Sequence, residues 1–579
     1  MQILDSITLA AVVAELQRTW TGARIDRIHL PTPHEMAWQL RGDGRNGRLF
    51  FSARGSFARL HLTDRKSENP PQPPMFGMLL RKHLEGSRLL RIEQLELERV
   101  VQLVTTGRDE LGDPIERALI AEITGKHSNF ILLDRPWGTV LGALRIVTPE
   151  VSRERQIMPG LPYDPPPIAK GKHDPRTLTD AQLFEVLAKG GTLDSVLLSG
   201  VHSLSRHAIG QLLEAAGLDP RSPADGLDAD QLSRLATTWQ RAMGAIARGE
   251  FDPRLTPGRP WDYSVLSLGG AGLAPVCPLL DAYYGRLETA ERLEGQRAGL
   301  RAIATERLSR LRHKVASLTE ALEAAQEAET WRQWGELIQA YGYQLPPGSD
   351  CLRVPNHFLA DSPEVAIPLD PRETAMANAQ RLFRRYRKAR AAREVSERFL
   401  AEARSELAYW EGIQGAIALC DTLAELAEIR AEITPEAPAK GRSTKPPPET
   451  QPLSLRSSDG LEILVGKNNR QNDRVTMKLA RADDWWFHTR DIPGSHVLVR
   501  LAPGQRDLPE RTRHEAAMVA AYYSQARDSG QVPVLYTQRR HLKKPAGARP
   551  GLVLYEREKT LFVTPDPAML ARLQGLAES

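Results

Sequence analysis

The chain has 579 residues, 41% of them hydrophobic and 26% charged, so it is long enough for several folded domains and too apolar to be disordered. No apolar run approaches the roughly 20 residues that span a bilayer, and the first residues lack the basic region of a signal peptide, so we expect neither a membrane protein nor a secreted one. The three cysteines, Cys277, Cys351 and Cys420, lie far apart without a CxxC pair. This spacing argues against a disulfide framework or a zinc site and fits the cytoplasm.

The net charge of +5 is unevenly distributed along the chain. Residues 372–394 carry a net charge of +6, residues 454–579 carry another +6, and the rest of the chain is acidic, at −7. Two basic regions on an acidic body indicate contacts with polyanions at particular places. A solvated helix face and an ordinary basic domain would give the same charges, so charge alone leaves both interpretations open.

Residues 1–170 are predicted to form an α/β domain. Apolar residues at helical spacing predict helices over Ile7–Leu16 and Met75–Leu84. Alternating or continuous apolar runs predict strands over Arg24–Leu30, Arg48–Phe51, Arg59–Leu62, Leu95–Thr105 and Ala118–Leu133. The proline-rich residues 159–167 are predicted to end this domain as an extended connector.

Within a second domain at residues 171–270, residues 175–250 are predicted to form short helices joined by turns that contain glycine. Residues 271–430 are predicted to form a coiled coil. Two heptad seams carry the second prediction: Ala304, Leu308, Leu311, Val315, Leu318, Leu322 and Ala325 in one run, and Ala379, Leu382, Tyr386, Ala389, Leu400, Ala403, Leu407 and Trp410 in the other. About 30 irregular residues, Tyr341–Asp370, separate the runs, which predicts an antiparallel arm on the order of 80 Å long. A compact helical bundle is the alternative.

Residues 431–453, with Pro446, Pro447 and Pro448, are predicted to be a flexible linker. Residues 454–579 are predicted to form a compact α/β module. One helix is expected over Arg511–Ser524, and strands over Leu461–Val465, His496–Leu501, Val532–Thr537, Leu552–Tyr555 and Thr560–Val563.

Two groups of residues suggest chemistry but favour a structural role. Gly125-Lys126-His127-Ser128 looks like the end of a phosphate loop, but Ile120 stands where the upstream glycine belongs. His488, Asp491 and His496 surround a Pro-Gly turn, where a metal is conceivable, although isolated histidines are more often structural. We therefore predict no catalytic residue, no metal and no cofactor.

The C-terminal module contains two features typical of RNA binding. Within Asp483–His488, alternation turns Trp485 and Trp486 to opposite faces, which predicts one core ring and one exposed ring that stacks on bases. A basic loop after a strand contains Arg539, Arg540, His541, Lys543 and Lys544, and such a loop can grip phosphates. A merely solvated loop is the alternative.

Six motifs spread over essentially the whole chain resemble those of the NFACT family, which includes bacterial ribosome quality-control factors. They lie at residues 73–84 (PPMFGMLLRKHL), 122–129 (EITGKHSN), 369–371 with 378–380, 484–488 with 493–496, 543–551 and 563–566. The resemblance implies a multidomain α+β protein. Its N-terminal domain is similar to that of formamidopyrimidine-DNA glycosylases, and a helix-hairpin-helix-like domain, a coiled-coil arm and an α/β RNA-binding module follow.

The resemblance also implies a function. NFACT proteins of this kind bind large ribosomal subunits (50S) that hold a trapped peptidyl-tRNA. They recruit charged tRNA, alanine tRNA in bacteria, so that untemplated residues are added to the nascent chain and mark it for degradation. The ribosome forms the peptide bonds, so we expect a monomeric adaptor and not an enzyme.

The resemblance places tRNA binding at Glu98, Arg99, Glu122, Ile123, Thr124, Lys126, His127 and Asn129. It places RNA binding at Asp484, Trp485, Trp486, His488, Arg539, Arg540, Lys543 and Lys544. The family more often has Asp before Arg99 and Met at position 124. We expect Arg99 to contact tRNA, with Glu98 fixing its rotamer and Glu122 either orienting Arg99 or accepting a hydrogen bond from a base amino group. A local Glu98–Arg99 surface ion pair is the alternative.

Two rival functions follow from relatives of these domains. A DNA glycosylase or lyase needs an N-terminal proline amine as nucleophile, but Gln2 and Ile3 follow Met1 here. A fibronectin-binding surface adhesin would need a route to the surface, and no signal peptide, membrane segment or sorting signal is predicted. We expect neither activity.

Overall fold

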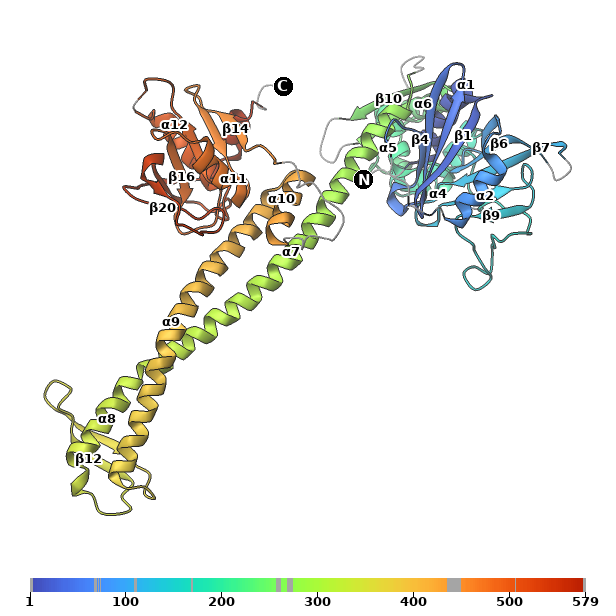
Figure 1. Ribbon diagram of the computed structural model, residues 1–579. Coiled ribbons are helices and arrows are strands. Elements are labelled where there is room, and N and C mark those ends of the chain that lie inside the picture. The colour runs from blue at the N-terminus through green and yellow to red at the C-terminus, as the bar shows by residue number, and fades with distance from the viewer. Residues whose placement is uncertain are drawn as a thin grey trace. The chain divides into compact units, whose positions relative to one another are not determined.

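The computed structural model describes residues 4–66, 70, 72, 74–108, 112–167, 170–256, 262–267, 274–434, 449–505 and 507–575, with only the backbone of 324–326. The chain is a multidomain α+β protein that divides into two compact units, residues 1–289 and 290–579 (Figure 1). Gln2, Ile3, Pro73 and the proline run 446–448 lie outside the described residues. Among the described residues, no helix has the length and apolar content needed to cross a membrane.

The N-terminal unit contains two antiparallel sheets whose strands pair in chain order. The first sheet consists of β1 (Arg24–Thr32), β2 (Glu35–Gly42), β3 (Arg45–Ser52) and β4 (Arg59–Leu62). The second consists of β5 (Leu89–Gln94), β6 (Val100–Arg108), β7 (Pro114–Glu122), β8 (Asn129–Leu133) and β9 (Val140–Ala143). The helices α1 (Ser6–Trp20) and α2 (Met75–Leu84) pack against these sheets in one hydrophobic core. The bounds of α2 are those predicted from the sequence.

Two strand predictions in this unit are wrong at the turns. Leu95–Thr105 is not one strand, because Glu96 and Leu97 adopt positive φ values of 42° and 57° and turn the chain between β5 and β6. Ala118–Leu133 is a hairpin, in which Gly125 with φ 71° opens a short 3-10 turn, η2 (Gly125–His127), between β7 and β8. Both turns lie at the same end of the strands of the second sheet.

A helical region follows in the same unit, as predicted. It contains α3 (Asp180–Leu187), α4 (Leu193–Gly200), α5 (Arg206–Ala215) and α6 (Ala229–Ala247). Thr179 and Asp228 begin α3 and α6 with complete capping boxes, which satisfy backbone amides at the start of each helix. A hairpin of β10 (Phe251–Thr256) and β11 (Asp262–Leu266) ends the region and was not predicted.

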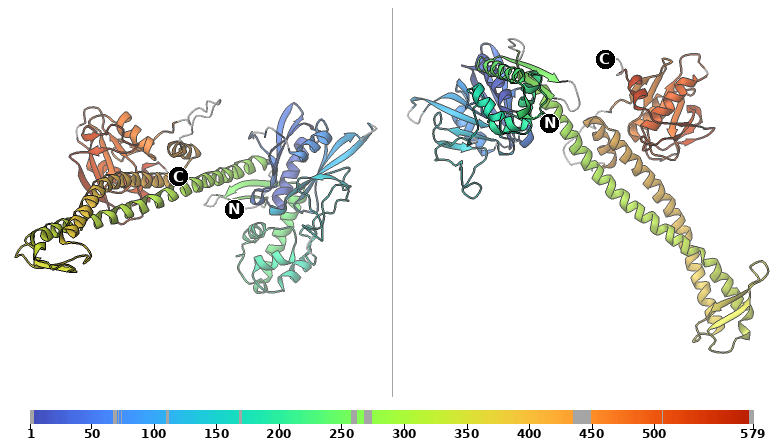
Figure 2. Two further views of the ribbon diagram at one scale, coloured as in Figure 1. Left: turned by 60° about the horizontal axis from the view of Figure 1, so that its bottom comes forward. Right: turned by 180° about the vertical axis from the view of Figure 1, so that it is seen from behind.

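Two long helices, α7 (Cys277–Gln326) and α9 (Ala375–Leu419), lie side by side in opposite directions in both views (Figures 1 and 2). Part of the predicted seam is buried between them, including Ala304, Leu308, Leu311, Ala403 and Trp410. The connection is more ordered than predicted. It contains α8 (Ala328–Tyr341) and a hairpin of β12 (Cys351–Pro355) and β13 (Glu364–Pro368) with a small core of its own.

The chain then forms α10 (Leu423–Ile433), so the predicted linker begins inside a helix, and its residues 435–448 lie outside the described part. The C-terminal module is a six-stranded antiparallel sheet in the order β14-β15-β17-β16-β18-β21. Its strands are β14 (Leu453–Arg456), β15 (Glu462–Val465), β16 (Trp485–Thr489), β17 (Val497–Arg500), β18 (Val532–Gln538) and β21 (Lys559–Val563). Packed on the sheet is α12 (Glu510–Tyr522), and the module also contains α11 (Asn469–Asp473), the π-helical turn η5 (Arg474–Leu479), the two-residue strands β19 (Leu542–Lys543) and β20 (Leu554–Tyr555), and α13 (Pro567–Leu573).

Candidate RNA-binding sites

The turn between β5 and β6 presents Arg99 at one end of the second sheet. Leu97 is buried beneath the turn, and the Glu98 amide donates to the Leu95 carbonyl at 2.5 Å. The Gln94 side-chain amide donates to the Glu98 carbonyl at 2.8 Å and to the Ser6 carbonyl at 2.9 Å. Buried contacts and hydrogen bonds therefore fix the turn from below.

The turn between β7 and β8 lies directly beside the first. The Ile123 amide donates to the Arg99 carbonyl at 2.8 Å, which joins the two turns. Ile123 and Asn129 are buried, and the Asn129 side chain bonds to the backbone of Arg145. The side chains of Lys126 and His127 are exposed and that of Thr124 is half-buried, so of this motif only these three can reach a ligand.

Arg99 differs from the other charged residues around it. Its side chain is half-buried, and within the described part of the chain its guanidinium has no hydrogen-bond or ion-pair partner. The predicted contact with Glu98 is not formed, because the Glu98 carboxylate accepts a hydrogen bond from the Ser203 hydroxyl at 2.6 Å instead. The alternative interpretation, a Glu98–Arg99 surface ion pair, is likewise not formed among the described residues.

Glu122 does not orient Arg99 as predicted, since its side chain is buried and points to other partners. Arg155 donates to both Glu122 carboxylate oxygens, at 3.2 Å for Nη1, and the Tyr163 hydroxyl donates to Oε1 at 2.8 Å. Burial and then the neighbouring Glu122 carboxylate raise the pKa of the Tyr163 hydroxyl well above its usual value. This cluster of Glu122, Arg155 and Tyr163 lies at the end of β7, where the second turn begins.

In the C-terminal module, Trp485 and Trp486 point to opposite faces of the sheet, as alternation predicts. Trp486 is buried in a small core with Leu464 and Leu498. Trp485 is half-buried against Tyr536, with ring centroids 5.7 Å apart, and is therefore not the exposed ring that the sequence predicts. Asp484 is buried as well, and its carboxylate accepts from the backbone amides of Arg481 and Leu501.

His488 and His496 pack around Trp486. The His488 ring stacks on Trp486 at 5.7 Å, and the rings of His488 and His496 lie 5.3 Å apart. Burial lowers the pKa of His488 to about 4, so the ring is neutral at physiological pH. No three His, Cys, Asp or Glu side chains of the described residues are grouped so that they could hold a metal ion.

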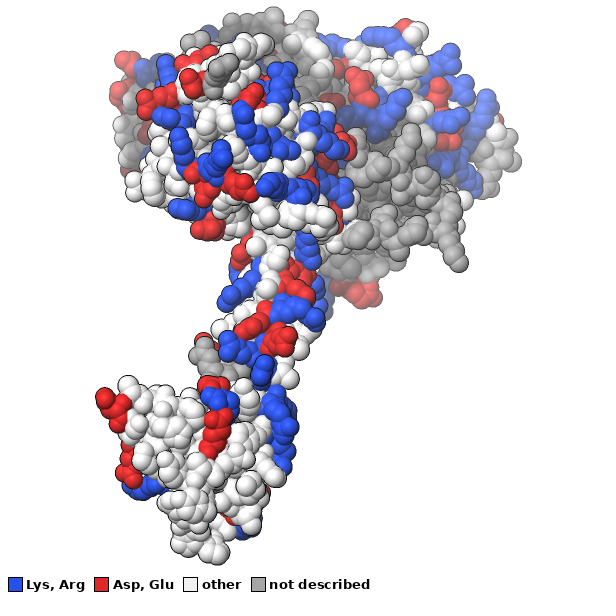
Figure 3. Space-filling model, turned by 60° about the vertical axis from the view of Figure 1, so that its left-hand side comes forward, with Lys and Arg blue, Asp and Glu red and all other residues white. Residues whose placement is uncertain are grey.

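The basic loop is more structured and less free than predicted. It forms a 3-10 turn, η6 (Arg539–His541), followed by β19. The Arg539 guanidinium points inward and donates to the carbonyls of Thr476 and Leu542. The other three cations each face a carboxylate: Arg540 pairs with Asp483, Lys543 with Glu556 and Lys544 with Asp473. Basic and acidic side chains are likewise interspersed over the module (Figure 3).

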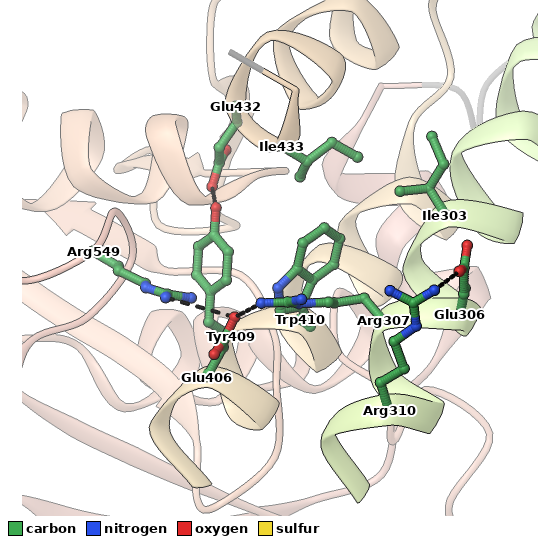
Figure 4. A pocket seen from close by; sticks show the side chains of 10 residues that line it. All are labelled: Ile303, Glu306, Arg307, Arg310, Glu406, Tyr409, Trp410, Glu432, Ile433 and Arg549. Atoms are coloured by element: carbon green, nitrogen blue, oxygen red, sulfur yellow. Dashed lines mark hydrogen bonds and ion pairs between the residues drawn. The ribbon is translucent and has the colours of Figure 1, made fainter. Parts of the chain in front are cut away.

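A cavity of about 540 Å³ that the sequence did not indicate lies between the base of the arm and the C-terminal module (Figure 4). Glu406 pairs with Arg307 at 2.6 Å and with Arg549 at 3.9 Å. Arg549 also lies over the Tyr409 ring, at 4.7 Å from its centroid. These contacts tie the loop at 545–551 to α9. Since the residues come from three distant segments, no local pattern in the sequence could have grouped them.

Comparisons with known proteins show the family to which the chain belongs. The family model of the NFACT N-terminal and middle domains matches residues 5–451, and the family model of the NFACT protein RNA binding domain matches residues 452–556. Over 98% of its length the chain is 33% identical to the Rqc2 homolog RqcH of Bacillus subtilis and 32% identical to that of Streptococcus pneumoniae serotype 2, covering 99% of each relative. The N-terminal structure of the fibronectin/fibrinogen-binding protein of Streptococcus suis is 30% identical over 49% of this chain and 99% of that one, with a TM-score of 0.40. The chain therefore belongs to the NFACT family.

Proposed function

We propose that the chain is an adaptor of ribosome quality control. It binds large ribosomal subunits that hold a peptidyl-tRNA and recruits tRNA, alanine tRNA in particular, for untemplated C-terminal tailing of the nascent chain. Family membership and the RNA-binding domain support this function. The observation that carries it is Arg99, a guanidinium with no partner among the described residues, on a turn fixed beside the exposed Lys126 and His127.

Arg99 suits a nucleic acid for physical reasons. A guanidinium stays charged at all physiological pH values and donates two parallel hydrogen bonds to a phosphate or to a base edge. One good bidentate contact contributes about 1–3 kcal/mol to recognition. Glu122 then acts indirectly, through its buried ion pair with Arg155 next to the turns. Lys126 adds a phosphate contact from the neighbouring turn.

The other modules take separate roles in this proposal. Residues 1–170 form the glycosylase-like domain and 171–270 the helix-hairpin-helix-like domain, while the arm at 271–430 and the module at 454–579 hold the ribosome. Arg540, Lys543 and Lys544 contact ribosomal RNA by exchanging their carboxylate partners for phosphates, while the buried Asp484 and Trp486, with His488 stacked on Trp486, support the RNA-binding face. Peptidyl transfer belongs to the ribosome, and the chain acts as a cytoplasmic monomer without a cofactor.

Affinity purification of the full chain from cells, followed by RNA sequencing and gradient sedimentation, tests the proposal. We expect large-subunit ribosomal RNA with a narrow set of tRNAs, and sedimentation with free large subunits. Recovery mainly with small subunits or polysomes would contradict it. A chain found on the cell surface and absent from ribosomal fractions would instead favour an adhesin, and covalent trapping on an abasic site would favour a lyase.

A further inference from the structure

The turn that carries Arg99 is attached to the helical region through a serine in an unusual backbone conformation. Ser203, in the loop between α4 and α5, has φ 65°, a left-handed conformation that residues other than glycine, Asn and Asp rarely adopt. Its hydroxyl donates to Glu98 Oε1 at 2.6 Å and lies 2.6 Å from His202 Nδ1. Its carbonyl accepts a hydrogen bond from the Ser6 hydroxyl. Ser203 therefore joins the helical region to both α1 and the β5–β6 turn.

Glu98 is held on this side by two groups at once. His202 Nδ1 lies 3.4 Å from the same carboxylate oxygen, and the His202 side chain is only 9% exposed. Because the carboxylate points toward Ser203, it leaves the Arg99 guanidinium without an internal partner. The next peptide group along the chain is held by the Ile123 amide, which donates to the Arg99 carbonyl. Both ends of the Arg99 backbone are thus restrained by contacts with other segments.

Resting on the proposed tRNA binding by Arg99, we infer that Ser203, supported by His202, is a positioning residue for the tRNA site. It holds Glu98, and through Glu98 it sets the direction in which Arg99 leaves the turn. A side chain that is already held in its bound direction loses less conformational freedom when the ligand binds. The tRNA site is then composite, because the sheet provides the cation and the helical region holds it in place.

Closing the turn itself does not depend on Ser203. Leu97 is buried beneath it, Glu98 donates to the Leu95 carbonyl, and Gln94 bonds to the Glu98 carbonyl. The Glu98 side chain, in contrast, is 27% exposed, and among the described residues the Ser203 hydroxyl is the one hydrogen-bond donor to its carboxylate. Losing the Ser203 hydroxyl should therefore loosen Glu98 and Arg99 without unfolding the domain.

Two substitutions at one position isolate the hydroxyl. Ser203→Gly removes it, and glycine adopts the left-handed conformation without strain. Ser203→Asn supplies a new donor on a residue type that tolerates the same conformation. In the full chain we expect Ser203→Gly to weaken tRNA affinity by about 3- to 10-fold, through the lost preorganisation, and Ser203→Asn to recover part of that loss. Amide hydrogen exchange over residues 95–99 should be the same in Ser203→Gly as in the unmodified chain, because other contacts close the turn.

Combining Ser203→Gly with Arg99→Ala in a double-mutant cycle separates the possible outcomes. We expect no further loss of tRNA affinity from Ser203→Gly once Arg99 is absent. An equal further loss, or a faster exchange over residues 95–99 in Ser203→Gly, would overturn the positioning role. If Arg99→Ala weakens tRNA binding and Ser203→Gly does not, the inference fails while the proposed function stands. If Arg99→Ala binds tRNA normally, the proposed function fails, and the inference fails with it.

Discussion

Replacing Glu122 by alanine should destabilise the N-terminal unit, because this carboxylate is the partner of a nearly buried cation. The side chain of Glu122 is 2% exposed and that of Arg155 is 17% exposed. Removing one partner of a buried ion pair leaves the other charge uncompensated and costs about 3–5 kcal/mol. Tyr163 also loses its acceptor, which lies 2.8 Å away. Tyr163→Phe, which removes one hydrogen bond to a charged acceptor, should cost less, about 1.5–3 kcal/mol.

Thermal unfolding of the full chain, followed by a signal from the N-terminal unit, measures this effect. At about 2–4 °C per kcal/mol for a domain of 150–250 residues, Glu122→Ala should lower the Tm by roughly 6–20 °C. Arg99→Ala is the matched control, since its guanidinium has no partner among the described residues and its loss should leave the Tm unchanged. A Glu122→Ala chain with an unchanged Tm and no tRNA binding would refute this reasoning and would mean that Glu122 contacts the RNA itself.

Three further measurements test other parts of the account. The log–log salt slope of RNA binding should fall by about two to three units when Ala replaces Arg539, Arg540, Lys543 and Lys544, because three of them exchange carboxylates for phosphates and Arg539 points inward; an unchanged slope would show that the loop does not contact RNA. Burial lowers the pKa of His61 from 6.5 to about 4, so between these pH values the unfolded chain binds a proton that the folded chain does not. The free energy of unfolding should therefore fall by about 3 kcal/mol as the pH drops from about 6.5 to about 4. Denaturant titrations should show this loss reduced in His61→Gln, and the same pH dependence in both chains would contradict it. Trp486→Ala should destabilise the C-terminal module by about 3–5 kcal/mol and the half-buried Trp485→Ala by less, as read from denaturant midpoints; the reverse order would contradict the burial of the two rings.

Regular elements with a strong period were predictable from this sequence. The helix over Met75–Leu84 has the predicted bounds because its apolar residues repeat at helical spacing after Pro74. The heptad runs likewise indicated two antiparallel helices. The turn at Leu95–Arg99 was missed because it contains two leucines and no glycine or proline, and its positive φ values fall on Glu96 and Leu97. An apolar run of this kind reads as a strand.

The candidate site was only partly predictable, for a different reason. Motifs identified Arg99 and Glu122, but the partners that decide their roles are distant in the chain. Glu122 meets Arg155 and Tyr163, which are 33 and 41 positions away, and Glu98 meets Ser203 across 105 positions. A single sequence contains no local signal for such contacts. Spacing between neighbours suggested instead that Glu98, Arg99 and Glu122 would contact one another.

The recovery of tRNA with an Arg99→Ala chain tests the central claim most directly. The chain is purified from cells beside the unmodified protein and an Arg153→Ala control, which removes an exposed arginine of the same unit. We predict that Arg99→Ala lowers tRNA affinity by about 5- to 150-fold, the equivalent of one bidentate contact, while large ribosomal subunits are still recovered. Arg153→Ala should retain both. Normal amounts of tRNA on the Arg99→Ala chain would contradict the account.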